Sequence, residues 1–388
     1  MIRHCCPIER NNEGWNGLSV TTSGTGRTGL LAYSGTNDVN GNIIGLVGSN
    51  TDQQWISFAI QPSAITDAQS NVIAAWGLSS GAHYVLCVET SGGTNWIFSV
   101  RYWNGSSYSG SLGSYNFGAV STWIWLNWER TNSTGAQKVY LDDTQRISFT
   151  HTTTPVPSME NFYWKKDVTN AKWVYTAKYY IDDFLWNNTE TPAEAWTDAL
   201  SDSLEFGLNN IESVSSTDHS YVMCFQWAVI GPSADTSLNV RPSSAYTVPQ
   251  LLPNADSASP YNDFTGYADT TNKYNNVDGD VVNYNYATAA NQSQMHGFAA
   301  SSPGAGNAVL AVAGMWRGDQ NNGNQLWDGN NFLRTATGRS VESLAMTTAG
   351  SYPNMVENPG SNYHGLWVMQ QPPALAPAST FVPRLMVY

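Results

Sequence analysis

Apolar and polar residues alternate along residues 123–130, where tryptophan and asparagine at odd positions interleave with isoleucine, leucine and tryptophan at even positions. A polar turn at 131–136 leads into a second alternating run at 138–143. Successive side chains of a strand point to opposite faces, so this pattern predicts a pair of half-buried strands. A third run, residues 179–186, alternates in the same way and carries two adjacent aspartates. Together the three runs favour a two-sheet antiparallel β-sandwich.

Further strand-like segments recur along the chain, with turn residues between them. They are residues 55–60, 72–78, 83–89, 96–103, 147–150, 162–164, 220–230, 281–286, 308–316, 366–369 and 381–387. Regularly spaced short strands are typical of an all-β fold. One helix is predicted as well, because Thr191 and Glu194 have the spacing of a capping box and Trp196, Leu200 and Leu204 follow at intervals of four.

A chain of 388 residues is longer than one ordinary sandwich, so two β-domains are expected. We predict a β-sandwich at 1–205 and a connecting strand and linker at 206–255. A second, smaller β-domain is expected at 256–388, where asparagine, aspartate, tyrosine and alanine become frequent.

Composition and charge exclude several classes of partner. Charged residues make up 12% of the chain and aromatic residues another 12%, which suits short strands and many turns better than helical bundles. The formal net charge of −13 opposes binding to nucleic acids and to anionic membranes. The longest mildly apolar run, residues 307–316, is too short for membrane insertion. No basic segment followed by an apolar one opens the sequence, so no cleaved signal peptide is expected.

The four cysteines do not have the spacing of a disulfide framework or of a metal site. Cys87 and Cys224 lie within apolar strand patterns and are predicted to be buried free thiols. No cofactor is expected. A structural calcium ion is one reading of residues 275–280, where oxygen ligands gather around a glycine; a solvated acidic turn is the other.

The sequence predicts no enzyme. Glycoside hydrolysis needs two carboxylates roughly 5–10 Å apart across a groove. Glu89 and Glu129 each stand alone in the sequence. The adjacent aspartates at 142–143 and at 182–183 are expected to point to opposite faces of their strands, which places each pair badly for shared acid–base chemistry.

The loop at 102–116 is the candidate for sugar recognition, because it combines aromatic rings with amide and hydroxyl groups and several glycines. Trp103, Asn104, Tyr108 and Tyr115 are the candidate glycan-binding residues. The alternative is that Trp103 ends a core strand and that Tyr115 packs beneath the loop.

Short motifs spread over nearly the whole chain resemble those of a protein family. They are Gly26-Arg-Thr-Gly29, Trp55-Ile-Ser-Phe-Ala59, Val139-Tyr-Leu-Asp-Asp143, Tyr180-Ile-Asp-Asp-Phe184, a strand near Ser237-Leu-Asn-Val-Arg-Pro242, and the Asp-rich segment 276–284. The first 200 residues resemble the concanavalin A-like, or laminin-G-like, jelly-roll domains of tailed-bacteriophage virion proteins. The later part is similar to the domain that follows in such proteins.

This resemblance implies a bacteriophage virion structural protein on the particle surface, as a capsid decoration, head fibre or tail component. It further implies other virion proteins as partners, a homo-oligomer such as a trimer, assembly in the host cytoplasm, and binding to host cell-surface glycans. A secreted carbohydrate-binding protein is the alternative function, and a glycoside hydrolase is a third.

Overall fold

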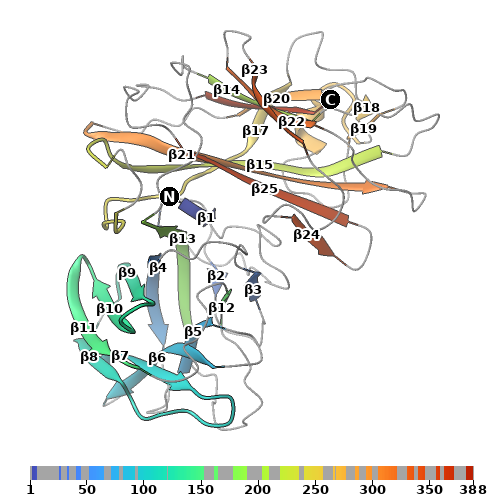
Figure 1. The fold of residues 1–388 in the computed structure, drawn as a ribbon. Helices are drawn as coiled ribbons and strands as arrows, with labels where there is room; N and C mark the ends of the chain where they lie inside the picture. The colour runs from blue at the N-terminus through green and yellow to red at the C-terminus, as the bar shows by residue number, and fades with distance from the viewer. Residues whose placement is uncertain are drawn as a thin grey trace. The chain divides into compact units, whose positions relative to one another are not determined.

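The structure is a computed structural model, shown in Figure 1. The structure describes residues 2–6, 26–27, 33–34, 41–44, 52–64, 71–77, 82–91, 95–119, 121–152, 161–164, 178–189, 203–208, 219–235, 240–256, 265–266, 268–276, 285–287, 294–298, 305–320, 330–335, 340–345, 355–358, 362–370 and 382–387. These residues form strands, turns and one short 3-10 turn, η1 (Lys273–Asn276). The predicted all-β antiparallel sandwich is confirmed.

Contacts group the chain into two compact units. Unit 1 contains residues 1–191 and 238–248, and unit 2 contains 192–237 and 249–388. The residues expected to form a connecting strand and linker, 206–255, are therefore shared between the units.

Unit 1 is built from two sheets, which we call sheet A and sheet B. Sheet A has the strand order β1-β13-β4-β9-β10-β11, with β2 also paired to β13. Its strands are β1 (Ile2–Cys6), β2 (Tyr33–Ser34), β4 (Gln53–Ala64), β9 (Ile124–Thr131), β10 (Ala136–Leu141), β11 (Thr144–Thr150) and β13 (Lys178–Asn188). Sheet B has the order β3-β12-β5-β6-β7-β8. Its strands are β3 (Gly41–Ile44), β5 (Asn71–Gly77), β6 (His83–Ser91), β7 (Asn95–Trp103), β8 (Gly113–Gly118) and β12 (Asn161–Trp164).

Unit 2 also contains two sheets, sheet C and sheet D. Sheet C has the order β17-β20-β26-β14-β22-β23, and its β14–β26 pair is parallel. Its strands are β14 (Ser203–Leu208), β17 (Pro253–Asp256), β20 (Gln294–Phe298), β22 (Asn330–Thr335), β23 (Ser340–Ala345) and β26 (Val382–Val387). Sheet D has the order β18-β19-β15-β21-β25-β24, with β16 paired to β15. Its strands are β15 (His219–Pro232), β16 (Gln250–Leu251), β18 (Thr265–Gly266), β19 (Asn285–Ala287), β21 (Asn307–Gln320), β24 (Met355–Asn358) and β25 (Asn362–Gln370).

The core of unit 1 follows the alternation seen in the sequence. Ile56, Phe58, Leu126 and Trp128 of sheet A point inward, as do Leu86 and other residues of sheet B, and together they form one buried cluster. Their neighbours at odd positions consequently face outward from sheet A. Because the chain places tryptophan, serine, asparagine and glutamate at those positions, the outer face of sheet A is polar although it is buried.

Three expectations about local structure are wrong. Leu204 belongs to strand β14 and not to a helix, while the rest of the predicted helix lies outside the described residues. The loop expected at 102–116 contains a strand, β8, paired with β7. No strand forms at residues 240–242, the described part of the segment expected to be one.

Candidate functional site

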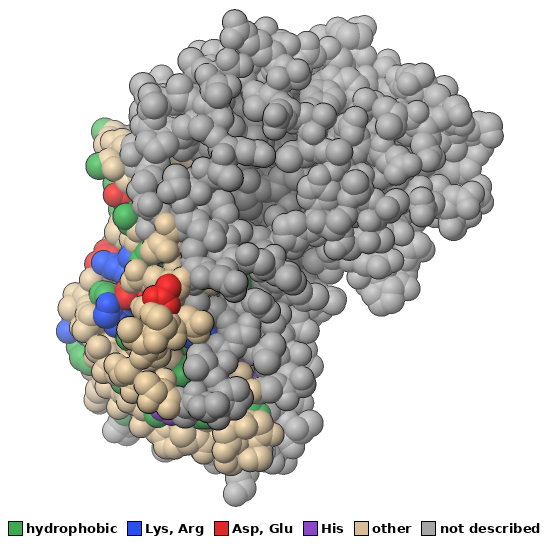
Figure 2. Space-filling view, viewed as in Figure 1, with side chains coloured by type: hydrophobic (Ala, Val, Ile, Leu, Met, Phe, Trp, Pro, Cys, Tyr) green, Lys and Arg blue, Asp and Glu red, His purple; other side chains and the backbone are tan. Residues whose placement is uncertain are grey.

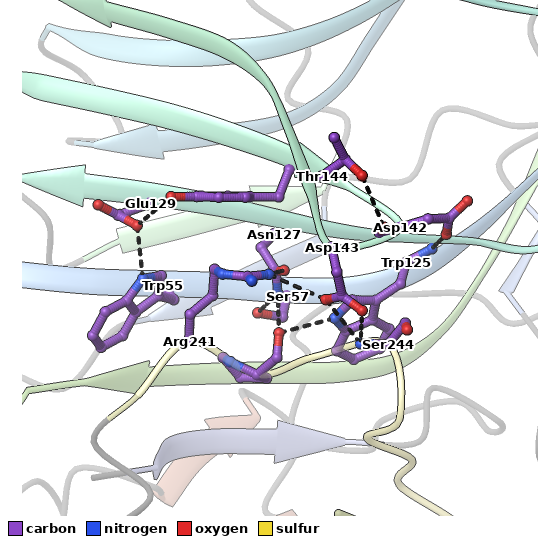
Figure 3. A network of polar contacts seen from close by, with 12 residues as sticks. Trp55, Ser57, Trp125, Asn127, Glu129, Asp142, Asp143, Thr144, Arg241 and Ser244 are labelled. Carbon is purple, nitrogen blue, oxygen red and sulfur yellow. Dashed lines mark hydrogen bonds and ion pairs between the residues drawn. The ribbon is translucent and has the colours of Figure 1, made fainter.

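A network of polar contacts covers the outer face of sheet A, and residues 240–248 form its outermost layer (Figure 3). We call residues 240–248 the crossing segment. The Pro242 carbonyl accepts hydrogen bonds from Trp125 Nε1 at 3.2 Å and from Asn127 Nδ2 at 2.9 Å. Asn127 Nδ2 also donates to Ser57 Oγ at 2.6 Å. Trp125 and Asn127 of β9 thus find hydrogen-bond partners in the crossing segment, and Ser57 of β4 is satisfied by Asn127.

One aspartate pair, Asp142 and Asp143, forms the hairpin between β10 and β11, from which Asp143 holds the crossing segment. Both residues have positive φ, 46° and 64°, as a two-residue type I′ turn requires, and aspartate tolerates this conformation. Asp142 Oδ1 accepts from the Trp125 backbone N–H at 2.9 Å. Asp143 accepts from the Ser244 N–H at 3.0 and 3.1 Å and pairs with Arg241 at 3.2 Å.

The other pair, Asp182 and Asp183, lies in strand β13, from which Asp183 holds the crossing segment. Asp183 has φ 55° at an irregularity in the β4–β13 register. Its carboxylate is fully buried, accepts from the Val248 N–H at 2.6 Å, and pairs with Arg27 at 2.9 Å. Asp182 Oδ2 accepts from the Arg27 N–H at 2.5 Å. The prediction that these two side chains point to opposite faces is wrong, because the positive φ interrupts the alternation and both carboxylates meet Arg27.

Arg27 completes this half of the network. Its guanidinium donates to the carbonyls of Tyr246, at 2.8 Å, and Ser244, and it lies 5.0 Å from the centre of the Trp125 ring. Three motifs on which the family resemblance rests, around residues 27, 143 and 183, therefore meet at the crossing segment.

Glu129 is a second centre of contacts on the same face. Its buried carboxylate accepts from Lys138 Nζ at 2.7 Å, Gln53 Nε2 at 2.9 Å and Trp55 Nε1 at 3.1 Å, and from the Tyr140 hydroxyl at 3.3 Å. Burial raises the pKa of Glu129, but the hydrogen bonds from Lys138, Trp55 and Gln53 outweigh burial and lower it below 4.5. The pKa of Lys138 is raised, chiefly by its hydrogen bond to Glu129. These groups are therefore held in their charged forms at neutral pH.

The two glutamates considered for hydrolysis lie on opposite sides of the sandwich. Leu86 and Val88 point into the core, so Glu89 faces outward from sheet B, whereas Glu129 faces outward from sheet A. Packed sheets are about 10 Å apart, and side chains on their outer faces are farther apart still. This separation exceeds the roughly 5–10 Å that shared attack on a glycosidic bond requires.

The structure brings together Trp103, Asn104 and Tyr108 of the predicted glycan residues. Trp103 is 7% exposed and pairs with Tyr108 in an isolated β-bridge, with ring centres 4.7 Å apart. His83 lies beside both rings, at 6.1 and 6.4 Å. Asn104 is exposed, and its carbonyl oxygen accepts from the N–H groups of Ser106 and Ser107, each at 2.8 Å.

Tyr115 lies apart from that group. Tyr115 lies in β8 and is paired with the core residue Phe98 of β7, so its side chain faces the core. Trp103, an odd number of residues from Phe98 along β7, faces the other side of sheet B. Arg146 covers the Tyr115 ring at 4.7 Å. Tyr115 therefore packs at the edge of the core, which agrees with the alternative considered from the sequence.

Part of the outer face of sheet B is apolar, in contrast to the polar outer face of sheet A. Val72, Ala75, Val85 and Cys87 form a buried cluster there, against which Tyr108 packs. Cys87 is a free thiol, as predicted, and burial raises its pKa to about 12. The side chain of Cys224 lies outside the described residues.

Part of the candidate calcium segment is described, and the side-chain amide of Asn276 forms hydrogen bonds with the backbone. Asn276 is buried and bonds to the backbone N–H and carbonyl of Asp269 and to Asn285 Oδ1, at 2.8–3.0 Å. Asp269 accepts from the N–H groups of Thr271 and Asn272. Residues 277–280 lie outside the described part. Among the described residues, no three His, Cys, Asp or Glu side chains lie close enough to share a metal ion.

None of the helical segments described in the structure could span a bilayer.

No protein-family model and no curated protein sequence matches the chain. Similar solved structures include the alginate lyase Aly36B, with 12% identity and a TM-score of 0.34, covering 48% of this chain and 97% of that one. The carbohydrate-binding module CBM66 of Bacillus subtilis has 17% identity and a TM-score of 0.30, covering 46% and 99%. The receptor-binding domain of a botulinum neurotoxin mosaic serotype C/D has 11% identity and a TM-score of 0.32, covering 84% and 71%. Identities and TM-scores this low carry no inference about function.

Proposed function

We propose that unit 1 is a non-catalytic glycan-binding domain whose binding surface is the turn after β7. The observation that carries this proposal is the position of Tyr108, which is half-buried against Trp103 beside the exposed residues Asn104 and Ser107. A supported aromatic ring with neighbouring amide and hydroxyl groups suits the apolar face and the hydroxyl edge of a sugar.

The turn at 104–107 is held in one conformation. The Asn104 N–H donates to the Ser107 carbonyl at 3.2 Å, and the Asn104 side-chain carbonyl accepts three hydrogen bonds within the turn. The Asn104 amide nitrogen remains available as a donor, as does the Ser107 hydroxyl, in the part of the chain that the structure describes. Binding to a turn that is already ordered costs little conformational entropy.

Glycan-array binding followed by calorimetry tests this proposal. Tyr108→Ala is expected to weaken binding about threefold to tenfold, because a stacked aromatic contributes about 0.5–1.5 kcal/mol. Tyr115→Ala is the matched control, since Tyr115 is also a half-buried tyrosine but lies on the opposite face of sheet B, and its substitution should leave affinity unchanged. Unchanged binding in Tyr108→Ala, or an equal loss in Tyr115→Ala, would overturn the proposal.

The absence of catalysis is part of the same proposal. It is supported by the placement of Glu89 and Glu129 on opposite outer faces, and by the raised pKa of Lys138 and of Tyr140, which makes both poor bases at neutral pH. Incubation with a bound glycan should release no reducing ends and form no unsaturated sugar. Turnover that Glu129→Gln abolishes would show an active enzyme.

We also propose a virion setting, which rests on the family resemblance. In this setting the chain is a surface component of a bacteriophage particle, assembled in the host cytoplasm as a homotrimer with other virion proteins, and unit 1 contacts host-surface glycans. The observation that favours it is that the motifs carrying the resemblance meet in one network around Arg27, Asp143 and Asp183. Mass spectrometry of purified particles tests it, and absence of the chain from the particles would exclude this setting.

A further inference from the structure

Arg241 of the crossing segment is held rigidly on the outer face of sheet A. Its Nη1 donates to Asn127 Oδ1 at 2.8 Å and to Asp143 Oδ1 at 3.2 Å. Its guanidinium lies 4.2 Å from the centre of the Tyr140 ring. Figure 3 shows Arg241 between Glu129 and Trp55 on one side and Asp143 and Ser244 on the other. A guanidinium fixed by two hydrogen bonds and a ring contact has already lost most of its side-chain entropy.

The contacts of Arg241 leave one edge of its guanidinium unused. Both hydrogen bonds come from Nη1, and in the described part of the chain no acceptor meets Nε or Nη2. These two nitrogens donate in parallel along one edge of the guanidinium, which is the geometry that binds both oxygens of a single carboxylate. The side chain is 26% exposed, so solvent reaches it.

Lys138 supplies a second cation on the same face. It precedes Tyr140 by two residues in β10, so the two side chains point the same way and lie about 7 Å apart along the strand. Its ammonium donates to Glu129, and its side chain is 36% exposed. An ammonium has three N–H donors, so further donors are left for a ligand.

Each of the two cations is paired with one acid, Lys138 with Glu129 and Arg241 with Asp143, so the site carries no net formal charge. Glu129 has four donors around it, and Asp143 has the Ser244 N–H in addition to Arg241. Unit 1 as a whole is also nearly neutral, with 12 basic and 14 acidic residues and a net charge of −2, whereas unit 2 has 5 and 16 and a net charge of −11. Figure 2 shows basic and acidic side chains intermingled among neutral polar ones on the described part of the surface. An anion therefore meets little repulsion at unit 1.

From these contacts we propose that Arg241 and Lys138 form a binding site for the carboxylate of an acidic saccharide on the outer face of sheet A. The Nε and Nη2 edge of Arg241 holds the carboxylate, Lys138 donates to a neighbouring oxygen of the sugar, and Tyr140 supports the guanidinium from beneath. This site is separate from the turn around Tyr108, which lies on sheet B. The structure therefore assigns a carboxylate requirement to one face of the sandwich and not to the other.

Calorimetric titration with a trimer of galacturonic acid tests this site, with its methyl ester as the matched neutral ligand and acetate as a simple anion. The acid trimer is expected to bind, and the ester and acetate at the same concentration are not. Affinity should fall about tenfold in Arg241→Lys, which keeps the charge but loses the two-donor edge. It should fall about threefold to fivefold in Lys138→Gln, which loses a half-exposed charge worth up to about 1 kcal/mol.

Two further variants make the outcome decisive. Arg146→Gln removes an exposed cation from β11 of the same sheet and should leave the affinity unchanged, as should Tyr108→Ala at the other site. Equal binding of acid and ester, no binding of the acid trimer, or an equal loss in Arg146→Gln and Lys138→Gln would overturn the site. If Arg241→Lys unfolds, Lys138→Gln decides, since Lys138 makes no contact with the crossing segment in the described structure. Loss of acid binding in Tyr108→Ala would place the ligand at the turn instead.

Discussion

The two outer faces of the unit 1 sandwich are both largely buried but differ in chemistry. Sheet A turns asparagine, serine, glutamate and aspartate outward. The asparagine and the aspartates bond to the crossing segment and to Arg27, whereas the serine and the glutamate bond to other side chains of the sheet. Sheet B turns a cluster of valine, alanine and cysteine outward, which packs with Tyr108, although Glu89 also faces outward from this sheet. Directional hydrogen bonds and ion pairs hold the covering residues on the outer face of sheet A, whereas apolar packing holds Tyr108 on the outer face of sheet B.

Glu129 and Cys87 show what this difference means for a titratable group. Burial raises the pKa of both side chains. Hydrogen bonds from Lys138, Trp55 and Gln53 reverse that effect at Glu129, whereas at Cys87 burial exceeds the lowering influence of Arg101 and raises the pKa to about 12. The charge of a buried group is therefore decided by the donors within reach and not by burial alone.

Substitution of Asp183 is expected to have the largest effect. Asp183→Asn leaves the Arg27 guanidinium without its fully buried partner, and the free energy of unfolding should fall by about 3 kcal/mol. Asp143→Asn is the matched control, because Asp143 also has positive φ but its side chain is 35% exposed, and its loss should cost less than about 1 kcal/mol. Asparagine tolerates positive φ, so each substitution changes mainly charge. Denaturant unfolding measures both, and equal losses would contradict the comparison.

Substitution of Glu129 should have an intermediate effect that depends on pH. The folded-state pKa of Glu129 is lowered, so its contribution is fully present above about pH 4.5 and is lost as the pH falls through the folded-state value. At pH 7, Glu129→Gln should lower the free energy of unfolding by about 2 kcal/mol, since hydrogen bonds to a charged group are removed. Thermal unfolding at a series of pH values checks this, and the difference from the native protein should disappear at low pH. A difference that persists at every pH would mean that shape, not charge, matters at this position.

The smallest expected effect is the slow chemical labelling of Cys87, which does not involve a change in the free energy of unfolding. With a pKa of about 12 and a fully buried side chain, Cys87 holds its proton at pH 8 and should resist iodoacetamide in the folded protein. Mass spectrometry of the peptide that contains Cys87 measures the labelling. Denaturant should restore reactivity, whereas rapid labelling of the folded protein would show that the outer face of sheet B is open.

Strands with clear alternation, such as β4, β9 and β13, could be predicted from the sequence because alternation reports burial directly, but strands such as β1, β3 and β20 could not. Strand β8 was not predicted, since its Gly-Ser-Tyr-Asn composition resembles a loop and its strand character depends on pairing with β7. Leu204 was assigned to a helix because a spacing of four residues fits a helical face but also keeps residues on one face of a strand.

The candidate site was only partly predictable. The loop around Asn104 and Tyr108 could be identified from its composition, but alternation within β7 and β8 places Tyr115 on the other face of sheet B. The meeting of Arg27 with Asp183 joins residues 156 positions apart, and it depends on a positive φ at a residue other than glycine. A periodic pattern carries neither kind of information.

The return of residues 238–248 to unit 1 sets an order of events during synthesis. A ribosome that has completed residue 191 must add 57 more residues before Val248 can bond to Asp183. At bacterial or eukaryotic rates of about 5–20 residues per second, that delay lasts roughly 3–11 s. Throughout it the outer face of sheet A displays Trp125, Asn127 and Asp183 without their partners in the crossing segment. A nascent chain ending at residue 191 should therefore expose a tryptophan and unpaired polar side chains to which chaperones can bind. Neither unit is encoded by one uninterrupted stretch of the gene.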